Sequence, residues 1–246
     1  MPRSSATQDF ADRPPWTRPG FVASAALVLV VVIAGVVVAI ASRDDDRSTT
    51  GTPPPATLAP SEATPPQDLP TAVPTTAPAG VRWELVGQTA VPVSATAGPT
   101  RISGATAASY AHTPEGALMA AAQLMVRSAP SAGRDSWEPT VQRQFISSSD
   151  REQLLAALRD NPDDSSEPGE LSQIAGYQYQ SYTSDTAVIG LVLRAPSGGT
   201  ARYHVLTLTL LWRDADWRMQ APPGGAWISL NRVTNDLTGV VEWGAR

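Results

Sequence analysis

Apolar residues fall into distinct zones along the chain, and the first is an uninterrupted apolar run. Residues 21–41 contain no charged side chain, and Arg18 and Arg43 bound them on the two sides. At about 1.5 Å per residue, a helix of this length covers roughly 30 Å, the thickness of the hydrocarbon core of a bilayer. The pattern therefore predicts a transmembrane helix over 21–41, preceded by a cytoplasmic tail over 1–20.

A cleaved signal peptide is the alternative interpretation of this run, since Ala39 and Ala41 have the small-residue spacing of a cleavage site. Because a signal peptide has an apolar stretch of only about 7–15 residues, the length favours an uncleaved anchor. Three arginines precede the run and two follow it closely, so the positive-inside rule slightly favours a cytoplasmic N-terminus. We expect a single-pass protein of the cell membrane whose C-terminal domain is extracytoplasmic.

The zone after this run is dominated by Pro, Thr, Ala and Ser. Nine prolines lie between residues 48 and 80, and large apolar side chains are almost absent. Such a segment cannot bury enough surface to offset the entropy lost on ordering it. We therefore expect a disordered stalk over 42–80 that acts as an extended spacer.

Apolar periodicity begins in the last zone, residues 81–246, which we expect to form one folded domain. A short strand is predicted at Arg82–Val86, and the Gly-, Ser- and Thr-rich segment 98–108 is predicted to be a loop. The Thr-Pro-Glu sequence at 113–115 combines a capping residue, a first-turn proline and a carboxylate that favours the helix dipole. The residues up to about Arg127 are apolar on nearly all sides, which predicts a central buried helix.

Two further helices are expected before the pattern changes to that of strands. One covers 137–146, and the other begins at a capping box formed by Ser149 and Glu152 and ends before Asn161. The acidic segment 163–170 that follows predicts a solvated surface loop.

From residue 177 onward apolar and polar residues alternate, as in antiparallel strands joined by tight turns. The expected strands are centred on 177–180, 187–193, 206–212 and 217–220, with turns at 197–199 and 214–216. Three helices followed by a run of strands predict an α+β fold.

Composition limits the chemistry that this domain can perform. The chain of 246 residues has no Cys and a net charge of −5. Disulfides and thiolate chemistry are therefore excluded. The sequence contains no run of basic residues, so direct binding of nucleic acid is not expected.

The last predicted strand pair carries the sequence Leu-Trp-Arg-Asp-Ala-Asp-Trp-Arg-Met at 211–219. Placed after three helices and two strands, it resembles the final hairpin of the nuclear transport factor 2-like fold, in which a curved sheet wraps a long helix into a cone. The segment 110–117 and the closing Val-Glu-Trp-Gly at 241–244, together with the anchor and stalk, resemble uncharacterised actinobacterial membrane proteins of conjugative and integrative elements. The soluble domain of those proteins is similar to that of the bitopic inner-membrane assembly proteins of type IV secretion.

This resemblance implies a non-enzymatic, membrane-anchored scaffold or assembly component of a conjugation or secretion apparatus. Its implied partners are the membrane, other membrane proteins of the assembly and a second copy of the chain. Two alternatives remain open, since the same fold also hosts enzymes and small-molecule binders. The cone could serve as a ligand-binding or catalytic pocket, or the protein could be an accessory component of a lipid importer.

No group of residues in the sequence predicts a catalytic, cofactor or metal site. His204 shares a strand face with residues expected to be buried, but a hydrogen-bonded or solvated histidine near the strand end is the favoured interpretation. His112 is expected to fix the start of the first helix. Asp135 and Glu138 lie at a helix start, where carboxylates favour the dipole.

Two tryptophans in the C-terminal part are the candidate contacts with a partner. Trp227 lies in a Gly-rich segment and Trp243 lies near the end of the chain. Trp is enriched among the residues that dominate binding energies at protein interfaces.

The predicted topology can be tested by adding protease to the outside of intact protoplasts. We expect digestion of the C-terminal domain, because the short N-terminal tail and the long remainder place that domain outside. Full protection would reverse the orientation, and a mature product beginning near Ser42 would identify residues 21–41 as a signal peptide.

Overall fold

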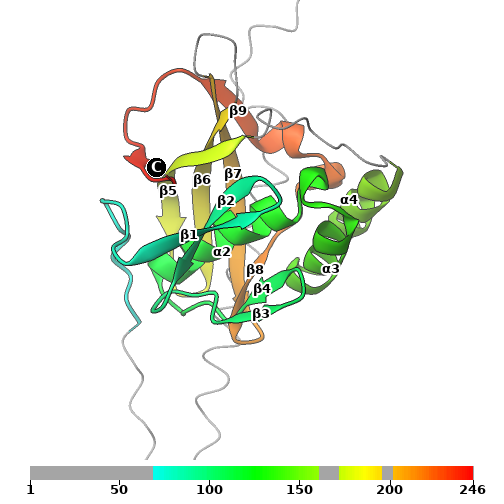
Figure 1. The fold of residues 1–246 in the computed structure, drawn as a ribbon, viewed down its shortest axis with the longest axis horizontal. Helices are drawn as coiled ribbons and strands as arrows, with labels where there is room; N and C mark the ends of the chain where they lie inside the picture. Colours follow the sequence, from blue (N-terminus) through cyan, green and yellow to red (C-terminus); the bar gives the residue numbers. More distant parts are fainter. Residues whose placement is uncertain (1–68, 161–171, 196–201, 246) are drawn as a thin grey trace, which may run out of the picture. The chain divides into compact units, whose positions relative to one another are not determined.

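The computed structural model describes residues 69–160, 172–195 and 202–245 (Figure 1). The predicted membrane segment 21–41, the stalk up to residue 68, the acidic segment 163–170 and the turn at 197–199 lie outside the described residues. Among the described helices, none is long and apolar enough to cross a membrane.

The described residues form an α+β domain in which three α-helices pack with a curved antiparallel sheet. Four short strands come first: β1 (Val81–Val86), β2 (Thr89–Ser94), β3 (Arg101–Ser103) and β4 (Thr106–Ala108). The helices follow as α2 (Pro114–Arg127), α3 (Arg134–Gln144) and α4 (Ser149–Asp160). The remaining strands are β5 (Gln173–Tyr182), β6 (Thr186–Ala195), β7 (Arg202–Arg213), β8 (Asp216–Met219), β9 (Asn231–Thr234) and β10 (Val241–Glu242).

The main sheet has the order β10-β5-β6-β7-β8, and every pairing in it is antiparallel. β8 pairs with residues 210–213 of β7 and β9 pairs with residues 203–206, so these two short strands share one edge of β7. The register of β5 shifts after Ile174 and again after Tyr179. Such bulges bend a strand and increase its twist, which accounts for the curvature of the sheet.

The helix α2 lies against one face of this sheet and forms the centre of the core (Figure 1). It begins where predicted, with the Oγ1 atom of Thr113 accepting a hydrogen bond from the Gly116 N–H at 3.0 Å. Only Glu115 and Met125 of the helix are not buried. Buried residues of β6 and β7 on the core side are Ala187, Ile189, Leu191, Leu206, Leu208 and Leu210. The prediction of a central buried helix beside alternating strands is confirmed.

The structure corrects two local predictions. The segment 98–108 was expected to be a loop, but it contains the hairpin β3–β4, whose strands are too short and too poor in large apolar residues to show alternation. The cap of α4 is Ser148 instead of Ser149, because the Oγ atom of Ser148 accepts from the Arg151 N–H at 3.1 Å. Glu152 therefore falls one position beyond the capping box and pairs with the Arg151 side chain at 2.8 Å.

The folded part begins before the predicted boundary at Val81. The hydroxyl of Tyr177, in β5, donates a hydrogen bond to the Thr76 carbonyl oxygen at 2.8 Å. Burial raises the pKa of Tyr177 to about 12, so this hydroxyl remains a donor at neutral pH. Residues 69–80, which the sequence assigns to the end of the stalk, are thus among the described residues and contact β5 through Tyr177.

The core can be tested by truncating Leu124 of α2 and Leu208 of β7 to Ala. Both side chains are essentially fully buried, so each substitution should lower the free energy of unfolding by about 2–5 kcal/mol. Urea denaturation measures this change. Leu85→Ala is the matched control because Leu85 is 72% exposed, and equal effects at all three positions would contradict the observed packing.

Candidate functional site

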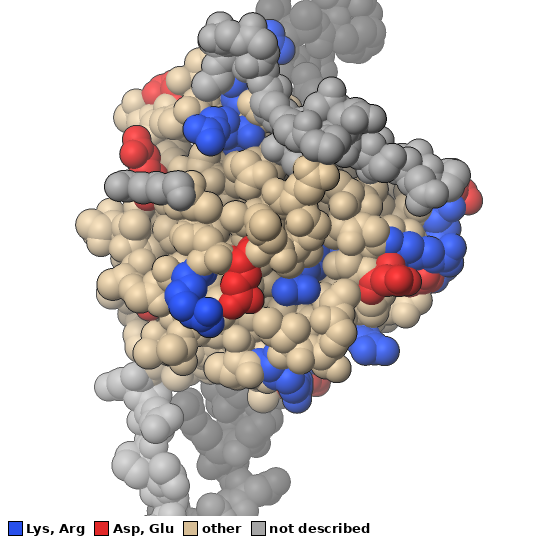
Figure 2. Space-filling view, in the orientation of Figure 1, with Lys and Arg blue, Asp and Glu red and all other residues tan. Residues whose placement is uncertain are grey.

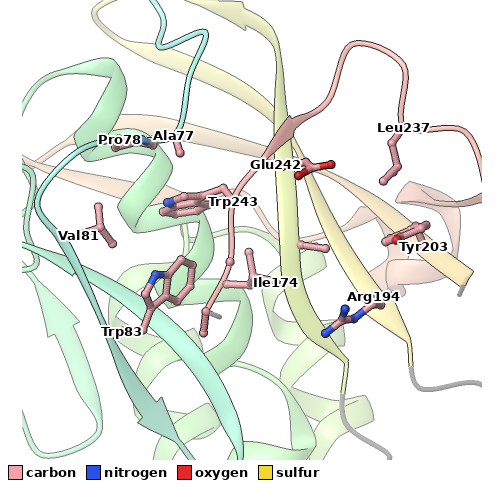
Figure 3. A pocket seen from close by; sticks show the side chains of 13 residues that line it. Ala77, Pro78, Val81, Trp83, Ile174, Arg194, Tyr203, Leu237, Glu242 and Trp243 are labelled. Carbon is pink, nitrogen blue, oxygen red and sulfur yellow. The ribbon is translucent and has the colours of Figure 1, made fainter.

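A hollow of about 470 Å³ lies where both ends of the folded part meet one end of the main sheet (Figure 3). Its walls come from the segment before β1, from β1 itself, from β5, β6 and β7, and from the C-terminal residues. We call it the aromatic hollow. Its principal side chains are Val81, Trp83, Arg194, Tyr203, Glu242 and Trp243.

Two tryptophan rings form the apolar end of the aromatic hollow. The ring centroids of Trp83 and Trp243 are 5.1 Å apart, with the ring planes tilted by 58°. Trp243 also meets the edge of Tyr177 at 5.5 Å. Tilted and edge-to-face contacts of this kind are favoured by the aromatic quadrupoles. The rings therefore hold one another in fixed orientations.

Glycine makes the approach of the C-terminal segment to β5 possible. A Cβ atom on Gly176 would lie 2.7 Å from the Val241 carbonyl oxygen, and one on Gly244 would collide with the Ile174 carbonyl. Between these two close contacts, the Trp243 N–H donates to the Ala175 carbonyl at 3.1 Å. The backbone thus brings Trp243 over β5 and beside Trp83 of β1.

The other end of the aromatic hollow is polar. Arg194 and Tyr203 are cross-strand neighbours on β6 and β7, and Figure 3 shows Glu242 between them and the tryptophans. Arg194 and Glu242 are exposed, and no ion pair of the described residues includes either one. The Nε1 atom of Trp243 is buried and has no hydrogen-bond partner in the described part of the chain. The hollow therefore presents apolar rings beside one acid and one base.

Only one of the two tryptophans predicted to contact a partner belongs to this hollow. Trp243 lines it, but with 5% of its surface exposed it offers little more than its face toward the hollow. Trp227 lies in a short 3₁₀ helix and packs half-buried against the core. Contact of either residue with a partner stays a prediction. No motif in the sequence connects Trp83, Tyr203 or Arg194 to the C-terminus, so none of the three was predicted to belong to a site.

Both histidines make structural contacts. The Nε2–H of His112 donates to the Ser184 carbonyl at 2.6 Å, and the imidazole stacks on Trp212 with centroids 3.9 Å apart. These contacts fix the segment that leads into α2, as predicted. The Nδ1 atom of His204 lies 3.0 Å from the side-chain nitrogen of Asn231, which confirms a hydrogen-bonded histidine near the start of β7.

The carboxylate of Asp216 is also used structurally. Its Oδ2 atom accepts from the Ser109 N–H at 2.9 Å, and its Oδ1 atom accepts from the N–H groups of Tyr110 and Trp217, both at 3.0 Å. Asp216 is 6% exposed. It therefore ties the segment before α2 to the β7–β8 hairpin.

The carboxylates near the start of α3 have different surroundings. Asp135 lies in the first helical turn, as predicted. Glu138 instead joins α3 to α4, because it pairs with Arg134 at 2.8 Å and with Arg159 at 2.6 Å. The hydrogen bonds from these two guanidinium groups lower the pKa of Glu138. Figure 2 shows basic and acidic side chains side by side over this region.

Comparison with known proteins identifies a family but no characterised relative. A family model described as a domain of unknown function (DUF8175) matches residues 44–242. No curated protein and no solved structure matches the chain. The matched range includes the main sheet, all three described helices and most of the aromatic hollow.

The role of Asp216 can be tested with Asp216→Asn. An amide keeps the shape but has only one acceptor oxygen, so buried N–H groups lose their partner at a cost of about 1–3 kcal/mol each. The free energy of unfolding, measured by urea denaturation, should fall by an amount in this range or above it. Asp185→Asn is the control, because Asp185 is exposed and its substitution should change stability by less than about 0.5 kcal/mol. Similar effects of both substitutions would refute the structural role.

Proposed function

We propose that this chain, which belongs to the DUF8175 family, is a membrane-anchored assembly protein that acts by binding another protein at the aromatic hollow. The observation that carries the proposal is the composition of that hollow. Trp, Tyr and Arg are enriched among the residues that dominate interface energies, and here Trp83, Trp243, Tyr203 and Arg194 line one concave surface.

The geometry of the hollow defines the chemistry of the partner. Rings that are fixed before binding lose little entropy on association, so the tryptophans suit an apolar side chain as anchor. Glu242 and Arg194 add one charge of each sign beside the rings. The partner segment therefore carries an apolar anchor residue flanked by a basic residue that meets Glu242 and an acidic residue that meets Arg194.

A non-enzymatic role is supported by the contacts of the titratable groups. His112 and His204 make hydrogen bonds within the domain, and Asp216 accepts three backbone N–H groups. The face of the sheet that packs on α2 is filled by buried side chains such as Leu191 and Leu208. This filling gives less support to a ligand pocket inside the sheet than to a docking surface outside it.

The remaining parts of the proposal concern the setting of the domain. Residues 21–41 anchor the chain in the cell membrane, and the domain is extracytoplasmic. Its fold is a member of the nuclear transport factor 2-like class, supported by three helices that precede a curved sheet around a buried helix. The proposed setting is the assembly of a conjugation or secretion apparatus. Anchoring raises the effective concentration of the partners in the membrane plane, which also favours self-association.

The docking site can be tested by charge reversal at the polar end of the hollow. Glu242→Arg and Arg194→Glu should each impair complementation of a deletion strain, because both side chains are exposed and a reversed charge opposes the partner. Arg101→Glu, on the exposed strand β3, is the matched control and should complement fully. The measurement is complementation at equal protein level, with folding checked by circular dichroism.

A photo-crosslinking amino acid identifies the surface directly. Placed at Val81, inside the hollow, it should give a discrete crosslinked product in cells, and Glu242→Arg should remove that product. Placed at Leu85, which is exposed on the same strand, it should not. Full activity of both charge-reversal variants, or the same product from both positions, would contradict docking at the hollow. Deletion of residues 21–41 should abolish function while the domain still folds.

A further inference from the structure

A second hollow, of about 360 Å³, lies between the end of α3, the start of α4 and the β7–β8 turn. Four arginines line it, Arg143, Arg151, Arg213 and Arg218, against one acidic residue, Asp214. We call it the arginine hollow. The charge of its lining is positive, whereas the net charge of the whole chain is −5. It shares no residue with the aromatic hollow.

Most of this positive charge has no partner in the described part of the chain. Arg151 pairs with Glu152 at 2.8 Å. None of the ion pairs formed by the described residues includes Arg143, Arg213 or Arg218. The hollow therefore concentrates three guanidinium groups without an ion pair among the described residues, and the single carboxylate of the lining cannot neutralise them.

Backbone carbonyls hold three of the guanidinium groups in place. Arg218 donates through Nη1 to the Arg143 carbonyl, Arg213 donates to the Trp212 carbonyl at 2.6 Å, and Arg151 donates to the Gln142 carbonyl at 3.3 Å. Arg213 uses only Nη1 in its contact and keeps its other N–H groups available, whereas Arg151 also donates to Glu152 through Nε and Nη2. The donors are thus partly ordered before a ligand arrives, which lowers the entropic cost of binding.

One donor in the arginine hollow has no acceptor. The Nε atom of Arg218 is buried and makes no hydrogen bond with the described residues. A buried donor without an acceptor costs free energy, and a negative charge in the hollow beside Arg218 would offset part of that cost. Unpaired positive charge and a buried donor in one hollow favour an anion site over a solvated basic surface.

We propose that the arginine hollow binds a phosphate group, either of inorganic phosphate or of a phosphorylated lipid headgroup. One carboxylate offers two oxygens and is matched by one guanidinium fork, whereas a phosphate offers more oxygens and a larger charge to several forks at once. Three unpaired guanidinium groups around one hollow therefore favour phosphate over the side chain of an acidic peptide. Ser147, also in the lining, adds a hydroxyl donor.

The test uses the full chain, purified in a non-ionic detergent at low salt and titrated by calorimetry. The probes are inorganic phosphate, dihexanoyl phosphatidic acid and, as a zwitterionic control, dihexanoyl phosphatidylcholine. We expect saturable binding of at least one of the first two probes and none of the third. Phosphate alone would identify a free-anion site, and phosphatidic acid alone would identify a headgroup site.

Arg143→Gln and Arg213→Gln should each weaken this binding about tenfold, because each removes charge-assisted hydrogen bonds. Both side chains are exposed, so the variants should fold, and an unchanged melting temperature without ligand verifies this. Arg101→Gln should change the affinity less than twofold. The proposal is overturned if neither inorganic phosphate nor phosphatidic acid binds. It is also overturned if the variant that combines Arg143→Gln and Arg213→Gln binds as well as the unchanged chain, or if a hexaglutamate peptide binds more tightly than both anionic probes.

Discussion

The carboxylate of Asp216 joins the two parts of the chain on which the rest of the domain depends. Asp216 lies on β8, more than 100 residues after the segment that precedes α2. Its carboxylate nevertheless accepts hydrogen bonds from the backbone N–H groups of Ser109 and Tyr110 in that segment. The indole Nε1–H of Trp217 adds a bond to the Ala111 carbonyl at 3.0 Å. Together these hydrogen bonds fix the position of the start of α2 relative to the sheet. They therefore also determine which apolar side chains of the helix pack against those of the strands.

Elements of the fold could be predicted where a pattern within one stretch of sequence determines them, and could not be predicted where they depend on contacts between distant stretches. The central helix and the strands β6 and β7 could be predicted, because their burial repeats at a short period in the sequence. The strands β3, β4, β9 and β10 could not, since they are too short to show a period, and β9 and β10 also pair with strands distant in the sequence. The same holds for the aromatic hollow, where Trp83 and Trp243 meet only after the chain has folded. The arginine hollow likewise combines helix and hairpin residues that no motif links.

The two hollows lie on different elements and offer different kinds of interaction to a ligand. The aromatic hollow offers rings fixed by mutual contact and a pair of opposite charges, so shape and apolar area dominate binding there. The arginine hollow offers unpaired guanidinium groups held by carbonyls, so charge dominates binding there and salt should weaken it. Since no residue is shared, the proposed protein partner and the proposed phosphate ligand would not compete for the same side chains.

The hydrogen bond from Tyr177 to Thr76 has a mechanical consequence. Ala77 and Pro78, directly after Thr76, belong to the wall of the aromatic hollow. A pulling force on the chain ahead of Thr76 therefore loads this wall before it reaches the core, with the Tyr177 hydroxyl as the first bond to resist it. In the proposed anchored protein, tension along the stalk and a partner bound in the hollow would therefore act on the same few residues.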